Sequence, residues 1–229
     1  YEEKNRAMDN MFRNLFATYL KNFFKEHPYG QQTVLGSVDH LKNPSLTKMR
    51  EYYDTYYVAN NMALILTGDI YPDEILPLIE AKFGVWKSGE IQAPIDIAEQ
   101  PFNGREKISR RMTPIKVGFM GYRTVPVGHD DEGALALSLQ LLTNESKTGL
   151  IDELVVDRKI MEAGAFNMDY VDMGAANFYF LPKLFFQSLT KAENLVRGQI
   201  DKLKSGKFDD EYFNAVKLTM VRQHEEYIE

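Results

Sequence analysis

The order in which helical and extended patterns follow one another is the feature of this sequence that most restricts its fold. Apolar residues recur at three- and four-residue steps over residues 8–23, which predicts an amphipathic helix. Ser45 is placed to cap a second helix over residues 46–57, and a third is expected over residues 72–83. Between these two helices, residues 62–66 form a continuous apolar run, which predicts a strand buried on both faces. The first third of the chain is therefore expected to combine helices with a sheet.

The remainder of the chain mixes the two kinds of pattern without a regular alternation. Two paired strands are expected over residues 107–111 and 115–122, and a hairpin over residues 165–171 and 176–181. Thr190 and Glu193 have the spacing of a capping box at the start of a helix. Further helices are expected over residues 130–142, 150–158, 190–206 and from 209 onward. This irregular order predicts an α+β fold rather than a regular parallel βαβ array.

A change in composition near the middle of the chain predicts a domain boundary. Residues 89–104 contain Pro94 and Pro101, a glycine at each end and scattered polar residues, which is typical of a linker. We therefore expect a first domain over residues 1–88 and a second over residues 105–229. Both ends of the chain lie inside charged helical patterns. We therefore expect both domains to be incomplete and the chain to be part of a longer protein.

Composition excludes several functional classes. The formal net charge is −6, and no dense run of Lys and Arg provides the basic face of a nucleic-acid-binding protein. The chain has no cysteine, which excludes disulfides, thiol nucleophiles and cysteine metal ligands. No apolar stretch approaches the ~20 residues of a transmembrane helix. With 44% hydrophobic residues, the sequence has enough apolar side chains to fill a core.

A series of short motifs in the first third of the chain resembles the pitrilysin/insulinase-type metallopeptidases. That family has a His-Pro-x-Gly loop, a helix ending in Tyr-Tyr shortly before Asn-Asn-Met, an apolar strand closing with Gly-Asp, and a helix ending in Phe-Gly. The corresponding residues here are His27-Pro28-Tyr29-Gly30, Tyr56-Tyr57, Asn60-Asn61-Met62, Gly68-Asp69 and Phe83-Gly84. No single motif is specific, but their common order is. The second half of the chain resembles the next domain of the same family more loosely.

The resemblance implies a fold, a reaction and a cofactor. Family members contain two related α+β domains, similar to LuxS and the processing peptidases, with helices packed on mixed or antiparallel sheets. The first domain carries an inverted zinc motif, His-x-x-Glu-His, whose histidines bind zinc and whose glutamate activates a water. A downstream glutamate completes the three protein ligands. The implied function is that of a zinc endopeptidase, which hydrolyses peptides or unfolded polypeptides enclosed between two halves or subunits.

The histidine motif itself is absent from this sequence. No two of its four histidines are four residues apart: His27, His40, His129 and His224. In the family, the motif lies upstream of the region that this chain resembles. The resemblance therefore implies that zinc belongs to the complete protein, and that this fragment alone binds none and is inactive.

Glu3 is the one residue here to which the resemblance gives a metal role. In the family, a helix carries the downstream zinc ligand, followed six residues later by Asp, and Glu3 with Asp9 matches this pattern. Glu2 becomes the ligand if the match is shifted by one residue. The six-residue step is just under two helical turns, which predicts that Glu3 and Asp9 share a face. Without the resemblance there is a plainer interpretation, because acidic residues near a helix start commonly interact only with the helix dipole.

A second family feature is missing from the second domain. Family members hold the substrate with an Arg and a Tyr in a Glu-Leu-Arg…Gly-Leu-x-Tyr pattern, and here Val155 stands at the Arg position and Glu162 at the Tyr position. The resemblance therefore implies a non-catalytic domain that forms one wall of the substrate chamber. The alternative is a non-catalytic subunit, or a peptide- or protein-binding scaffold, of the same family. The likeness of the first-domain pattern to bacterial members favours a periplasmic or envelope location.

Overall fold

The structure, a computed structural model, describes residues 1–32, 34–93, 95 and 97–228. It divides into two compact units, with unit 1 over Tyr1–Pro101 and unit 2 over Phe102–Glu229. The division falls within residues 89–104, where the composition predicts a linker.

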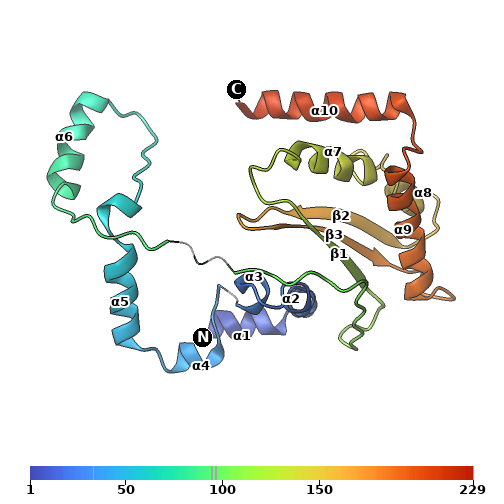
Figure 1. The fold of residues 1–229 in the computed structure, drawn as a ribbon, viewed down its shortest axis with the longest axis horizontal. Coiled ribbons are helices and arrows are strands. Elements are labelled where there is room, and N and C mark those ends of the chain that lie inside the picture. Colours follow the sequence, from blue (N-terminus) through green and yellow to red (C-terminus); the bar gives the residue numbers. More distant parts are fainter. Residues whose placement is uncertain (33, 94, 96, 229) are drawn as a thin grey trace. The chain divides into compact units, whose positions relative to one another are not determined.

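Unit 1 is built from helices (Figure 1). They are α1 (Glu2–Asp9), α2 (Met11–Phe23), α3 (Pro28–Gln31), α4 (Val38–Lys42), α5 (Leu46–Tyr56), the 3-10 turn η1 (Ala59–Asn61) and α6 (Pro72–Phe83). The expected first helix is interrupted at Asn10, where extended backbone ends α1 and the side chain accepts a hydrogen bond from the Arg13 N–H at 2.9 Å to begin α2. Ser45 caps α5 in the same way, as the sequence predicts, by accepting from the Lys48 N–H at 3.3 Å.

An aromatic cluster joins α2 to α3. The Phe23 and Phe24 rings meet edge to face with centroids 4.8 Å apart, and Phe24 meets Tyr29 in the same way at 5.7 Å. Tyr19 stacks on Phe23, and burial raises the pKa of the Tyr19 hydroxyl. A Cβ atom on Gly30 would clash with the carbonyl oxygen of Phe24. The glycine of the His-Pro-Tyr-Gly loop is therefore required by close packing of the backbone.

The strand expected over residues 62–66 does not form. Met62 to Leu66 have no regular secondary structure and are all exposed, with Ile65 83% accessible to solvent. A strand needs a neighbour to pair its backbone N–H and C=O groups, and none of the described residues of unit 1 forms one. The run is therefore apolar enough for a sheet interior but lacks a partner strand within the described part of unit 1.

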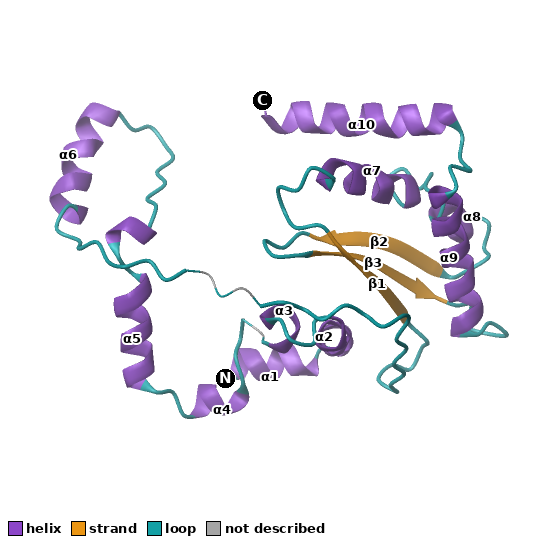
Figure 2. Cartoon of the chain, viewed as in Figure 1, coloured by secondary structure: helices purple, strands orange, loops and turns teal. Residues whose placement is uncertain are grey.

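Unit 2 contains a three-stranded antiparallel sheet (Figure 2). The strands are β1 (Gly118–Thr124), β2 (Glu162–Met168) and β3 (Gly174–Leu181), in the order β1-β3-β2. The hairpin expected from the sequence is confirmed as β2 and β3, which pair from Glu162 opposite Leu181 to Met168 opposite Ala175. Four helices complete the unit: α7 (Glu132–Leu142), α8 (Asp152–Val156), α9 (Leu189–Lys204) and α10 (Asp210–Ile228).

The strand expected over residues 107–111 is wrong. These residues have no strand structure, and β1 pairs with β3 instead of with them. The side chains of Arg105 and Lys107 form ion pairs with Glu193 on α9, with the Lys107 Nζ 3.9 Å from the carboxylate. The segment is thus held against a helix by its charges, which explains why alternating charged residues here do not indicate a strand.

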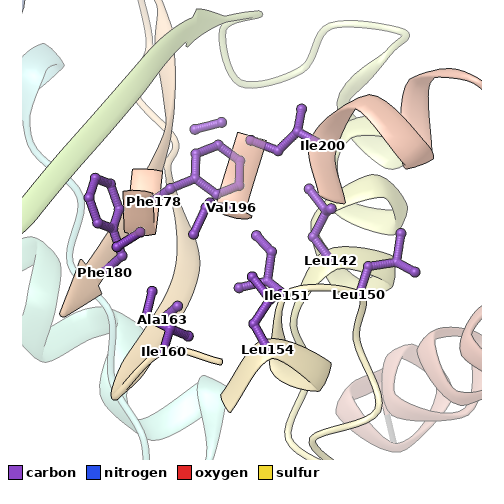
Figure 3. Packing of buried hydrophobic residues seen from close by; sticks show 12 residues of the cluster. Leu142, Leu150, Ile151, Leu154, Ile160, Ala163, Phe178, Phe180, Val196 and Ile200 are labelled. Carbon is purple, nitrogen blue, oxygen red and sulfur yellow. The ribbon is translucent and has the colours of Figure 1, made fainter. Parts of the chain in front are cut away.

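The core of unit 2 lies between the sheet and its helices (Figure 3). Strand β3 contributes Phe178 and Phe180, each 3% exposed, and the helical side contributes the fully buried Ile151 and Val196. Burying a large apolar side chain contributes about 1.5–3 kcal/mol. This cluster is therefore the main stabilising element of the unit.

The α+β class predicted from the sequence is confirmed, with helices packed around a small antiparallel sheet. The predicted cap of α9 is also wrong: α9 is capped by Ser188, whose hydroxyl accepts from the Lys191 N–H at 3.1 Å, and not by Thr190. Glu193 is used in the ion pairs described above instead of a capping box. Across the described residues, no helix is both long and apolar enough to cross a membrane.

Candidate functional site

Glu3, the predicted metal ligand, lies in the first turn of α1. Its neighbour Glu2 is in the same turn, and both side chains are exposed. Tyr1, at the N-cap, makes no side-chain cap, so the two carboxylates supply the negative charge that favours a helix N-terminus. Their position is therefore compatible with the dipole interaction alone.

Asp9 does not reinforce a ligand role for Glu3. Both residues are on α1, but six residues advance the helix by ~9 Å and ~600°, which leaves the two side chains about 120° apart around the axis. Catalytic zinc is held by three protein ligands. Within the part of the chain that the structure describes, no group of three His, Cys, Asp or Glu side chains is placed to hold a metal. The described residues therefore do not form a zinc site by themselves.

The His27 loop is fixed by hydrogen bonds and has the geometry of a structural element. The Glu99 carboxylate accepts from the backbone N–H groups of Glu26 and His27, each at 2.7 Å. The His27 Nδ1 accepts from the Tyr29 N–H at 3.3 Å, and its side chain is 4% exposed. Glu99 lies in the proline-containing segment after α6, so this tie connects the end of unit 1 to its first helices.

A buried carboxylate organises the connection between α7 and α8. Asp152 is 1% exposed and accepts hydrogen bonds from the Thr143 hydroxyl at 3.0 Å and from the N–H groups of Asn144 and Gly149 at 2.9 and 3.2 Å. The Lys147 Nζ lies 3.6 Å away. These hydrogen bonds satisfy the acceptor atoms of a polar group that burial would otherwise penalise. The Asp152 carboxylate therefore has a structural role, because it holds the turn at Thr148-Gly149-Leu150 in place.

Tyr212 extends this polar cluster to α10. Its hydroxyl donates to the Leu141 carbonyl at 3.1 Å and lies 3.2 Å from the Asn144 Nδ2, which donates to it. Burial raises the pKa of Tyr212, and the nearby Asp152 charge acts in the same direction. The phenol is therefore neutral at physiological pH and serves as a hydrogen-bonding link between α7 and α10.

Val155 and Glu162, which stand at the positions of the family's substrate-holding Arg and Tyr, have different structural roles. Val155 is part of α8 and packs against the core cluster. Glu162 is the first residue of β2 and lies opposite Leu181. Neither position provides a guanidinium or a phenol, so the hydrogen bonds that such a pair gives to a peptide are not available from these residues.

A shallow hollow of about 270 Å³ lies between the end of β1 and α7. Its polar lining consists of the Thr124 hydroxyl, the Asp131 carboxylate and Ser138, whose hydroxyl donates to the Ala134 carbonyl within its own helix. Catalysis by acid, base or nucleophile requires at least two groups in mutual contact, and these lining residues provide no such pair.

Comparison with known proteins assigns the chain to a family. A family model described as "Peptidase M16 inactive domain" matches residues 44–220, which is more than half of the chain. The chain belongs to the peptidase M16 inactive-domain family. This M16 membership agrees with the resemblance found in the sequence, since that family comprises the pitrilysin/insulinase-type peptidases.

The relatives of this M16 chain are proteases. It is 23% identical to the zinc protease PqqE of Helicobacter pylori over 229 residues, covering 95% of this chain and 50% of that protein. It is 24% identical to the mitochondrial-processing peptidase subunit beta of Caenorhabditis elegans, covering 78% of this chain and 41% of that protein. The chain therefore spans about half the length of the curated relatives it matches.

Solved structures agree on the fold. A protease from Helicobacter pylori has a TM-score of 0.75 at 20% identity, covering 99% of this M16 chain and 55% of the other. The first half of the periplasmic protease PqqL from Escherichia coli has a TM-score of 0.75 at 16% identity, covering 98% and 49%. At these identities the likeness establishes the fold of the chain.

The sequence did not indicate two carboxylates that each accept hydrogen bonds from two backbone N–H groups, Asp152 and Glu99. Asp152 has the spacing of an ordinary helix-start acid, and Glu99 lies in a segment that reads as linker. A weak signal existed for Asp152, because it follows a Thr-Gly turn whose N–H groups need an acceptor. For Glu99, whose partners lie 72 and 73 residues away, there was none.

Proposed function

We propose that this M16 chain is part of a zinc endopeptidase that hydrolyses peptides or unfolded polypeptides. The observation that carries the proposal is the match to the M16 family over residues 44–220, together with relatives that are zinc proteases about twice as long. In this proposal the catalytic centre is completed by residues outside the described chain. The chain alone is inactive in this proposal, because its described residues bring no set of zinc ligands together.

Each part of the chain has a distinct role in this proposal. Residues 1–88 form the C-terminal part of the zinc-bearing domain, residues 89–104 are the linker, and residues 105–229 are the second, non-catalytic domain. Glu3 is the third zinc ligand of the complete protein. The second domain supplies a wall of the substrate chamber, which is consistent with Val155 and Glu162 at the positions of the substrate-holding pair.

The exposed apolar run of residues 62–66 supports a partner strand in the rest of the complete protein. Its side chains are typical of a buried strand, yet no described residue of unit 1 pairs with it. We propose that strands from the rest of the complete protein pair with this run. A second half or a partner subunit then encloses the substrate. A periplasmic or envelope location is proposed, supported by the likeness to the periplasmic protease PqqL.

A peptidase assay with and without chelator tests the activity. The longer protein that contains this chain should hydrolyse an unfolded polypeptide, lose this activity when zinc is removed, and regain it when zinc is returned. The 229-residue chain should show none under the same conditions. Hydrolysis by the longer protein that is indifferent to chelator would contradict the proposal.

Substitution of Glu3 tests the ligand assignment, with Glu2 as a matched control. In the longer protein, Glu3→Gln should lower zinc affinity by more than the ~10–100-fold that loss of an outer partner costs, and activity should fall with zinc content. Glu2→Gln, one residue away in the same turn, should leave both unchanged. Full zinc occupancy in Glu3→Gln, measured by metal analysis on folded protein, would rule out the assignment.

A non-catalytic subunit or scaffold of the same family is the alternative function. It is favoured by one finding, the likeness to a subunit of the mitochondrial-processing peptidase, which is a protein of more than one chain. The two functions are separated by the sequence of the longer protein. An intact His-x-x-Glu-His motif upstream of the region matched by this chain supports the enzyme, and a broken one supports the subunit.

A further inference from the structure

The loop between β3 and α9 exposes three consecutive large apolar side chains. Leu184, Phe185 and Phe186 are 61%, 75% and 106% accessible, so the second phenylalanine is as exposed as in an extended peptide. The loop lies at the end of the sheet, beside the N-terminal end of α9 (Figure 1). Isolated exposed apolar residues are common on protein surfaces, but three in a row at a loop tip are not. We refer to residues 184–186 as the aromatic tip.

The aromatic tip is held in place by the residue that follows it. Phe186 has a φ of +64°, a left-handed backbone conformation that costs a non-glycine residue about 1–3 kcal/mol. Gln187 is 7% exposed, and its Oε1 accepts from the Lys183 N–H at 2.7 Å, while its Nε2 donates to the Lys159 carbonyl at 2.9 Å. A buried amide with both ends engaged therefore closes the loop at its base. The exposed rings are presented by a fixed backbone.

Lysines surround the aromatic tip. Lys183 precedes it directly, Lys191 lies in the first turn of α9, and the Lys116 Nζ is 3.5 Å from the Gln187 carbonyl oxygen. All three side chains are exposed. The carboxylate nearby on α9, Glu193, is already ion-paired with Arg105. This end of the sheet therefore presents net positive charge around an apolar protrusion, although the whole chain carries −6.

The opposite end of the same strand has a different character. The β2–β3 hairpin loop also exposes one large apolar side chain, Val171, which is 79% accessible. Its charged neighbours are Asp169 and Asp172. Two loops at opposite ends of β3 thus differ in both the size of the apolar tip and the sign of the surrounding charge.

We propose that the aromatic tip is a peripheral membrane-binding element, with an anionic phospholipid surface as its partner. Aromatic rings enter the region between headgroups and acyl chains, and the surrounding lysines contact anionic headgroups at the same depth. The interaction needs no transmembrane helix. It is independent of the proposed peptidase activity, because every residue involved belongs to unit 2, whereas Glu3 belongs to unit 1.

The shape of the tip favours a lipid surface over a peptide. Peptides and small ligands bind in concave sites that surround them, whereas Phe186 is fully accessible and no described residue encloses it. A lipid surface accepts a convex apolar protrusion without a complementary pocket. The lysines supply charge complementarity to anionic lipid, which a neutral apolar partner would not require.

Vesicle cosedimentation tests the proposal. The purified protein should bind vesicles of phosphatidylcholine and phosphatidylglycerol in equal parts and should not bind vesicles of phosphatidylcholine alone. Raising the salt concentration should weaken binding. Phe185→Ser combined with Phe186→Ser should lower the partition coefficient about a hundredfold, since two apolar rings no longer enter the interface. Lys183→Glu should lower it about tenfold.

Val171→Ser is the matched control, because it removes an exposed apolar side chain from the acidic loop of the same domain. It should leave vesicle binding unchanged. Circular dichroism and the unfolding midpoint of the double phenylalanine variant should match the parent protein, since the rings it removes are exposed. Three outcomes would overturn the proposal. They are absence of binding to anionic vesicles, unchanged binding by the double variant, or a double variant that changes the protein's assembly state in solution and leaves vesicle binding intact.

Discussion

The two units of this chain both contain amphipathic helices but have very different cores. Unit 2 buries Phe178, Ile151 and Val196 between a sheet and its helices. In unit 1, helix α5 has no buried residue, and Ile65 in the apolar run is 83% exposed. Helices form in both units because their hydrogen bonds are internal to each segment. Among the described residues, paired strands occur only in unit 2, where the apolar pattern closes into a sheet-based core, whereas unit 1 buries only a small cluster around Phe23 and Phe24.

This comparison predicts that equivalent substitutions have unequal effects. Phe178→Ala should lower the free energy of unfolding of this chain by about 3–5 kcal/mol, because it removes a ring from a closed core. Ile65→Ala should change it by no more than about 0.5 kcal/mol, because that side chain is already in solvent. Chemical denaturation of both variants, followed by circular dichroism, gives the two numbers directly.

The same two substitutions also test the proposal that residues 62–66 pair with strands of the longer protein. In the longer protein, where partner strands are proposed, Ile65→Ala should cost about 2–5 kcal/mol, as for other buried aliphatic residues. An effect that stays near zero there would mean that the run is not a buried strand. A cost in this chain comparable to that of Phe178→Ala would contradict the difference between the units.

Local signals in the sequence predicted the helices and the hairpin well. Ser45 and Pro72 mark helix starts through the hydrogen bonds and backbone angles of their own residues, and both predictions are confirmed. The strand over residues 62–66 was wrong because pairing depends on a distant segment. The strand over residues 107–111 was wrong, since β1 pairs with β3 and the side chains of Arg105 and Lys107 pair with Glu193, far along the chain. Periodicity reports the solvent-facing pattern of a segment but not its partner.

Carboxylates that accept hydrogen bonds from backbone N–H groups give a second contrast between the units. Asp152 in unit 2 is 1% exposed, whereas Glu99 in unit 1 is half-buried, yet each accepts from two backbone N–H groups. Asp152→Asn should destabilise the chain by about 2–3 kcal/mol, because an amide cannot accept all of these hydrogen bonds in a buried site. Glu99→Gln should cost about 1 kcal/mol, since water can replace part of what is lost. The measurement is the same denaturation experiment. Equal losses in the free energy of unfolding would mean that the Asp152 and Glu99 carboxylates are equally buried in solution.

The metal role of the candidate site was predicted from the family resemblance alone. The residues themselves indicate two acids at a helix start, which is where the structure places Glu2 and Glu3. The metal role of Glu3 stays a prediction, because among the described residues no group of three or more His, Cys, Asp or Glu side chains is placed to hold a metal. The aromatic tip was visible as the run Leu184-Phe185-Phe186, but its significance depends on the exposure and backbone angle that Gln187 imposes. Such information comes from tertiary contacts.

Helix caps provide the comparison with the smallest expected effects, because a serine cap of the same kind occurs in both units. Ser188 caps α9 and Ser45 caps α5, each by accepting from the N–H group three residues later. Ser188→Ala should lower the global free energy of unfolding by about 1 kcal/mol, since α9 packs on the core through Ala192, Val196 and others. Thr190→Ala, at the position that the capping-box spacing suggested, should have little effect.

Ser45→Ala should act only locally, because α5 buries no residue and can fray without disturbing a core. Hydrogen exchange separates the two cases. Protection should fall throughout α9 and the sheet in Ser188→Ala, but only in the first turn of α5 in Ser45→Ala. If Ser45→Ala lowered protection in unit 2, the units would unfold as one cooperative body, and the exposed apolar surface of unit 1 would have to be covered in solution. Confinement of each effect to its own unit would instead show that an identical cap stabilises a fold only where its helix has a sheet to pack against.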